Sequence, residues 1–245
     1  MLNPATFIGA PLNFQNKFYI YPPTIKDVVT NIYYPQFVRM LTISQEDITD
    51  ELSKKEDKPT EIPTPFEFLL INSYHNQYFS TLAKEAFKFF IQEDIEFIYD
   101  EKAIEILQKD KNEEKRSFLR EEDYFAFQNK IREVIGDKPI KPPEPVDPNE
   151  DPRITRIKAK ARERDRIKAR KGTKDGISLT TSLVAICCMG IGITPLNIGE
   201  MSYASIGPIV KMAQDKEKYD IDVRSLLAGA DSKKIKPKYW IRNSD

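Results

Sequence analysis

The side chains whose chemistry could support catalysis or metal binding are few, and their spacing does not bring them together. His75 is the single histidine, so a histidine-based triad or a metal cluster would need ligands that the sequence lacks, and we expect His75 at the surface. Cys187 and Cys188 are neighbours in an apolar run without a nearby base or cation, which is typical of core residues rather than nucleophiles. Gly190-Ile-Gly192 lacks the lysine and third glycine of a phosphate-binding loop and predicts a turn. We therefore expect a protein that is not an enzyme, with no catalytic residue, no metal site and no cofactor.

The strongest chemical signal is a run of positive charge. Residues 153–174 contain eleven basic residues against two acidic ones, whereas residues 1–137 contain 24 acidic residues against 16 basic ones, although the whole chain has a net charge of zero. Charge asymmetry of this kind gives information about partners rather than about the fold. The basic residues that we expect to bind a partner or a polyanion are Arg153, Arg156, Lys158, Lys160, Arg162, Arg164, Arg166, Lys168, Arg170 and Lys171.

The same segment predicts a helix that cannot be buried. Alanine, lysine and arginine are good helix formers, and Pro152 suits the start of a helix. Basic residues at every second position from Arg162 to Arg170 are spread around the helix instead of forming one face. Three interpretations stay open: an acidic protein surface, including that of this chain, a nucleic acid, or a solvated face. Residues 153–174 contain no aromatic residue, so nucleic-acid binding would involve phosphates and would be insensitive to base sequence.

The composition divides the chain into four parts. Six of the fifteen residues in 138–152 are prolines, which favour an extended polyproline conformation and predict a spacer between domains. We expect an acidic α+β domain over 1–137, a proline-rich linker over 138–152, a basic helix over 153–174 and a small all-α domain over 175–245. The predicted fold class is therefore α+β and mostly helical.

Hydrophobic spacing and capping residues predict the elements of residues 1–137. Phe18-Tyr-Ile-Tyr21 ends at two prolines and predicts an edge strand. Thr24 can cap a helix from Ile25, with apolar positions that continue to Leu41 and a break at Pro35. Further along we expect a capping box at 44–47, two amphipathic helices within 66–91, a hairpin with strands near 95–99 and 104–106, and a helix over 121–135 that ends at Gly136.

The remaining residues predict helices joined by glycine turns. An apolar helix over 179–188 is followed by the turn at 190–192, and Thr194 with Pro195 can start the next helix. A longer helix can begin at Ser202 or Ser205 and end at Gly229. The final segment is basic around the only tryptophan, and we expect Tyr239 and Trp240 to pack onto the helices as an anchor.

Two features concern the location of the protein. The first residues lack the basic and apolar regions of a signal peptide, so we expect a cytoplasmic protein. Residues 179–193 are mostly apolar, but they number about 15 where a membrane span needs roughly 20, and glycines interrupt them. This run predicts a buried core helix and no contact with a membrane.

The C-terminal pattern resembles tail morphogenesis proteins of tailed bacteriophages, and the tail assembly chaperones are the closest group. The resemblance covers about the last 70 residues. It rests on Ile186-Cys-Cys-Met-Gly-Ile-Gly-Ile-Thr-Pro-Leu-Asn-Ile198, Met201-Ser-Tyr-Ala-Ser205, Tyr219-Asp-Ile-Asp222, Leu226-Leu-Ala-Gly-Ala230 and Lys238-Tyr-Trp-Ile241. It implies a non-enzymatic protein of the host cytoplasm that binds the tape measure protein, self-associates and keeps tail components soluble.

The linker and the basic helix have no counterpart in that group. They leave open a permanent virion role, as a baseplate, neck or tail component that contacts a neighbour through the basic helix. A nucleic-acid-binding accessory that uses residues 153–174 is the alternative from another functional class.

Overall fold

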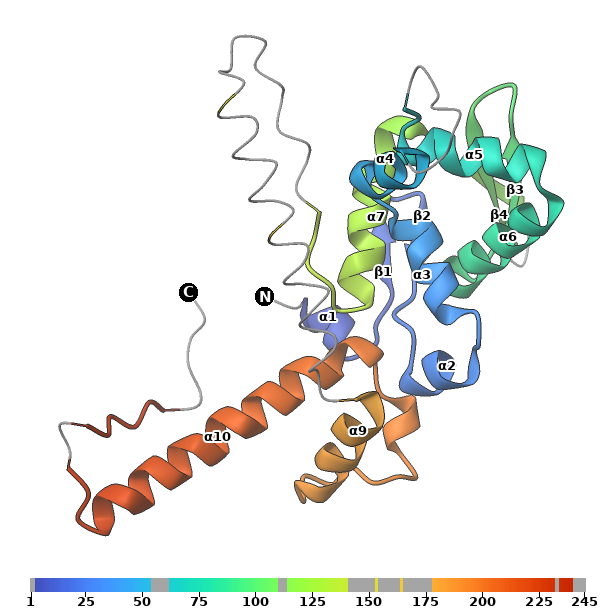
Figure 1. Cartoon of the computed structure of the whole chain (residues 1–245). Coiled ribbons are helices and arrows are strands. Elements are labelled where there is room, and N and C mark those ends of the chain that lie inside the picture. The colour runs from blue at the N-terminus through green and yellow to red at the C-terminus, as the bar shows by residue number, and fades with distance from the viewer. Residues whose placement is uncertain are drawn as a thin grey trace.

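The computed structural model describes residues 3–53, 62–109, 114–140, 153, 164, 178–231 and 234–239 (Figure 1). It confirms a mostly helical α+β fold with two small antiparallel sheets. In chain order the elements are α1 (Pro4–Phe7), β1 (Leu12–Phe14), β2 (Phe18–Ile20), α2 (Ile25–Thr30), α3 (Tyr34–Thr42), α4 (Gln45–Ser53), α5 (Pro65–His75), α6 (Gln77–Ile91), β3 (Asp94–Ile98), β4 (Ala103–Lys109), β5 (Glu114–Leu119), α7 (Glu121–Val134), α9 (Leu179–Cys188), the 3₁₀ helices η1 (Ile198–Glu200) and η2 (Tyr203–Ser205), and α10 (Ile206–Leu227).

Local sequence signals position the first helices. The Thr24 hydroxyl accepts a hydrogen bond from the Asp27 N–H at 3.2 Å, and the Asp27 carboxylate accepts one from the Thr24 N–H at 2.9 Å. Equivalent reciprocal bonds join Ser44 to Asp47 before α4 and residues 64 and 67 before α5, so the capping prediction at 44–47 is confirmed. The break predicted in the helix from Ile25 lies at 31–33, between α2 and α3, and Pro35 occupies the first turn of α3, where no proline N–H is needed.

The strand predictions are confirmed in part. β1 pairs with β2, and β3, β4 and β5 form a sheet in that order. The predicted hairpin is β3–β4, with Ile95 opposite Ile106 and Phe97 opposite Ile104. β1 and β5 were not predicted. β1 alternates but has only three residues, and β5 begins with three charged residues, so neither presents a long alternation of apolar and polar residues.

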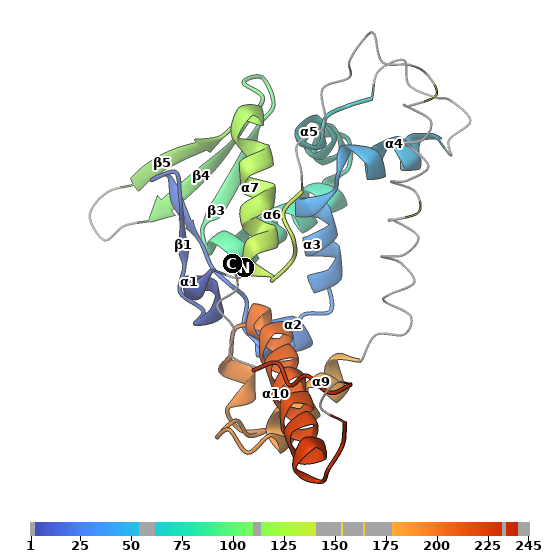
Figure 2. The same ribbon diagram turned by 90° about the vertical axis from the view of Figure 1, so that its left-hand side faces the viewer.

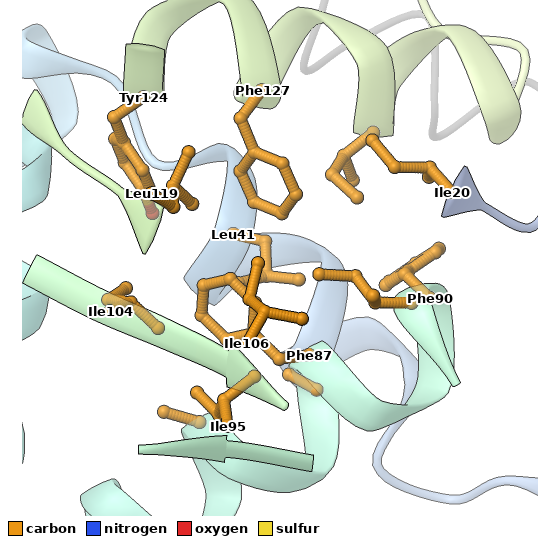
Figure 3. Close-up of a cluster of buried hydrophobic side chains, with 14 of the residues drawn as sticks. Ile20, Leu41, Phe87, Phe90, Ile95, Ile104, Ile106, Leu119, Tyr124 and Phe127 are labelled. Atoms are coloured by element: carbon orange, nitrogen blue, oxygen red, sulfur yellow. The ribbon is translucent and has the colours of Figure 1, made fainter. Parts of the chain in front are cut away.

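One aromatic core holds residues 3–140 together, and we call this part the body. The rings of Phe87 on α6 and Phe127 on α7 stack with centroids 5.4 Å apart at an interplanar angle of 8°. Figure 3 shows Phe127 pointing from α7 toward α6 and toward Ile104 and Ile106 of β4. The side chains of Phe127, Ile104 and Ile106 are fully buried. In Figure 2, α7 lies between the three-stranded sheet and the helices α3 and α5.

Residues 178–231 and 234–239 form a C-terminal helical unit that contacts the body at one place, which we call the joint. The Ile25 N–H donates to the Met201 carbonyl at 2.9 Å, and the Tyr203 N–H donates to the Pro23 carbonyl at 2.9 Å. The Tyr203 ring lies 5.8 Å from that of Tyr34. Burial raises the pKa of the Tyr34 hydroxyl above its ordinary value, so this hydroxyl stays neutral. The domain boundaries inferred from the sequence stay a prediction.

Two expectations for this unit are corrected. The α9 helix forms, but it is not a buried core helix, because only Ile186 is buried and Cys188 is exposed. The C-terminal unit is too small to surround it. Thr194 and Pro195 start no α-helix, because residues 195–197 form a turn that leads into η1. The long helix begins at Ile206 and ends before Gly229, whose φ is +93°, as predicted. None of the described helices is long and apolar enough to cross a membrane.

Gly136 provides a test of the joint. Its φ is +81°, and a Cβ there would lie 3.1 Å from the Cα of Ala204, which is tighter than an ordinary contact. We expect Gly136→Ala to lower the free energy of unfolding by about 1–3 kcal/mol in chemical denaturation. Gly229→Ala is the control, because Gly229 also has a positive φ, +93°, but open space surrounds it after the end of α10. Equal effects of the two substitutions would contradict close packing at the joint.

Candidate protein-binding surfaces

The C-terminal helical unit buries little of its apolar surface. Its small cluster consists of Ile25 from the body together with Ile186, Ile198 and Ile206. The α10 helix has 22 residues, a length of about 33 Å at 1.5 Å per residue, and Ile206 is its only buried residue. Figure 1 shows α10 extending away from the body. Helices in proteins gain most of their stability from packing of an apolar face, and here the fully buried contact lies at one end, with a second contact between Tyr219 and Tyr239.

Large apolar side chains of this unit face solvent. Leu196 is 96% exposed and Leu227 is 83% exposed. Val184, Met212 and Ile221 are also exposed. Single exposed apolar residues are ordinary, but several on one small unit indicate a contact surface for another molecule.

The α10 helix also carries apolar residues at the spacing of a helix–helix seam. Ile209, Met212, Tyr219, Val223 and Leu226 follow one another at intervals that fit a heptad pattern, with Lys216 at the remaining position. Ile209 packs on the small cluster, and the residues that follow are half-buried or exposed. This pattern suits a second helix laid along α10, which is a common mode of peptide recognition.

The basic segment lies largely outside the described residues. Arg153 and Arg164 are helical and exposed. The other eight predicted residues are Arg156, Lys158, Lys160, Arg162, Arg166, Lys168, Arg170 and Lys171, and they lie outside the described part of the chain. The structure therefore does not decide among the three interpretations of this segment.

The predicted aromatic anchor is described only at its first residue. The Tyr239 ring packs edge-on against Tyr219 of α10, with centroids 5.5 Å apart. Tyr239 nevertheless stays 55% exposed. Trp240 lies outside the described residues.

An aromatic groove on the body was not predicted. It has a volume of about 410 Å³ and lies between the α2–α3 turn, α3 and α6. Tyr33, Phe37, Tyr78 and Phe89 line it together with polar residues. Tyr33 and Phe37 belong to the apolar positions expected between Ile25 and Leu41, and the sequence holds no signal that separates a buried aromatic ring from one at the rim of a groove.

Negative charges outnumber positive charges at this groove. The Lys88 ammonium lies 2.9 Å from the Asp94 carboxylate, and this hydrogen bond raises the pKa of Lys88. Glu85 is exposed and makes no ion pair with any described residue. The charge of Glu85 also raises the pKa of Lys88, so at this groove one cation faces two carboxylates.

Metal-binding arrangements are lacking in the described part of the chain. His75 is exposed, as expected, and no group of three or more histidine, cysteine or carboxylate residues could hold a metal ion among the described residues. The Tyr124 hydroxyl is buried without a hydrogen-bond partner, and burial raises the pKa of this hydroxyl. Its surroundings are the aromatic core, so it lines no cavity that could hold a substrate.

Comparisons with known proteins give no match: no family model fits the sequence, and neither a curated protein nor a solved structure resembles it.

The basic segment can be tested against duplex DNA. If the protein acts through protein contacts, the chain should bind DNA weakly at physiological salt. Replacing Arg156, Lys160, Arg164 and Lys168 with alanine should then have no more effect than replacing Lys211, Lys216, Lys218 and Arg224, a matched loss of four cations on α10. Tight binding that only the first variant loses, with a log–log salt slope of about −0.9 per contacted phosphate, would favour a nucleic-acid-binding role.

Proposed function

We propose that the protein is a non-enzymatic phage tail assembly protein, of the tail assembly chaperone kind, that acts through protein–protein contacts of its C-terminal helical unit. The observation that carries the proposal is the exposure of large apolar side chains on α9, on residues 191–196 and on α10, beside a cluster of only four buried residues. Its assignment to phage tails comes from the resemblance of residues 186–241. The proposed location is the host cytoplasm during assembly.

The division of the chain into a packed part and an exposed part supports this proposal. The body has a continuous aromatic core of 25 buried residues, whereas the cluster of the C-terminal unit has four. The C-terminal unit depends on a partner to cover its exposed residues. A chaperone needs such a surface, because it must cover apolar segments of a partner until that partner is assembled. Self-association of the chain would use exposed surface of the same kind.

Two alternatives have support from particular features. A permanent baseplate, neck or tail component would use the same apolar surface, since both roles are binding functions. A nucleic-acid-binding accessory is favoured by the excess of nine positive charges over 153–174.

Pull-down with the tape measure protein of the same phage tests the proposed partner. Leu196 and Met212 are exposed, so Leu196→Ser with Met212→Ser should not unfold the protein. We expect this double variant to weaken binding about tenfold, which is a loss of about 1.4 kcal/mol. The control Ile71→Ser changes an exposed isoleucine on α5 and should bind normally. Unaltered binding of the double variant, or no binding by the natural chain, would contradict the proposal.

Mass spectrometry of purified virions separates the chaperone from the structural component. A chaperone leaves when the tube has assembled, so we expect no stoichiometric amount of this chain in mature particles. Stoichiometric recovery would reject the chaperone and favour a virion component.

A further inference from the structure

We propose that the aromatic groove of one copy binds the aromatic and basic segment Lys238-Tyr-Trp-Ile-Arg242 of a second copy. The inference deepens the self-association included in the proposed function and rests on that part of it. It does not depend on a tail component.

The groove has the shape and lining for large apolar side chains. Phe37 and Phe89 are in contact at its base, with ring centroids 5.7 Å apart, while Tyr33 and Tyr78 are 42% and 66% exposed. Its volume of about 410 Å³ lies within the range of roughly 300–1,000 Å³ that is usual for binding pockets. Ile32, beside Tyr33 in the sequence, is 80% exposed. These rings and aliphatic groups would be covered by an inserted aromatic side chain.

The charge of the groove selects a cationic ligand. Lys88 pairs with Asp94 and also interacts with the charge of Glu85, so two carboxylates share one ammonium group and one negative charge is left over. Lysine and arginine side chains are attracted both by such an excess of carboxylate and by the faces of aromatic rings. A suitable ligand therefore combines an apolar anchor with a nearby positive charge.

The C-terminal segment has this chemistry. It places Tyr239, Trp240 and Ile241 between the cations of Lys238 and Arg242. Tryptophan, tyrosine and arginine are the residues most often responsible for binding energy at protein interfaces. The excess of acid over base in residues 1–137 further favours a basic segment as the ligand.

The position of the segment points to a second copy. Tyr239 contacts the middle of α10, and Figure 1 places residues 234–239 on the opposite side of the molecule from α6. The groove and the segment are different surfaces, so the contact is head-to-tail, and repetition of it produces rings or open chains rather than closed two-fold dimers.

The single tryptophan makes the proposal directly measurable. With the purified full-length chain alone, we expect Trp240 emission to shift to shorter wavelength as protein concentration rises, in parallel with association in sedimentation. Tyr78→Ala with Glu85→Lys changes two exposed residues of the groove, and it should abolish both the shift and the association. Tyr19→Ala removes a comparably exposed tyrosine on β2, outside the groove, and should change neither.

Trp240→Ala should prevent association by sedimentation, which checks the segment without fluorescence. Short-wavelength emission that depends neither on concentration nor on the groove residues would place Trp240 on its own helices and overturn the proposal. Emission typical of exposed tryptophan at all concentrations, or association that persists in the groove variant, would overturn it equally. None of these outcomes bears on binding of the tape measure protein, because that protein is absent from the experiment.

Discussion

The backbone pairing between residues 23–25 and residues 201–203 holds the C-terminal helices on the body. Two hydrogen bonds of 2.9 Å and the isolated bridge between Thr24 and Ser202 fix the direction of the chain just before α10 starts. The cluster around Ile25, Ile198 and Ile206 excludes water from these bonds, which would otherwise compete with solvent. The arrangement of α9 and α10 relative to the aromatic core depends on this joint.

The joint uses few residues, and the consequence is an exposed helix. The body contributes Ile25 to the small cluster, so α9 and the start of α10 pack against this side chain. Beyond that end, α10 has no fully buried residue. Apolar residues along α10 at helix-seam spacing then remain available. The proposed protein-binding function follows from this imbalance between a well-packed body and a sparsely packed C-terminal unit.

The elements that the sequence predicted well are those with local causes. Thr24 and Asp27 lie three residues apart and define a helix start by themselves, and Gly136 and Gly229 follow helix ends because they adopt positive φ. Burial was harder to predict. Cys188 belongs to an apolar run that resembles a core helix, yet it is exposed, because burial depends on how much other chain is available to cover the helix.

The joint and the groove could not have been predicted from the spacing of residues. Thr24 pairs with Ser202, far along the chain, and Tyr33 lines the groove together with Tyr78 of α6. Such contacts depend on tertiary packing, and no local pattern of residues encodes them. The basic segment, in contrast, could be recognised from the sequence, because an excess of charged residues is visible in the composition. The composition does not identify the partner that such a segment binds.

Hydrogen exchange along α10 tests most directly whether this helix is unpartnered in the free protein. Ile206 is the only fully buried residue of α10, and the contact found further along is that of Tyr219 with the exposed Tyr239, so protection of the backbone amides should be highest at 206–213 and should fall over 214–227. The amides of α7, whose residues Phe127 and Ile131 are fully buried, should exchange far more slowly. Protection over 214–227 equal to that of α7 would contradict the account, because it would mean that the face of α10 assigned to a partner is already buried.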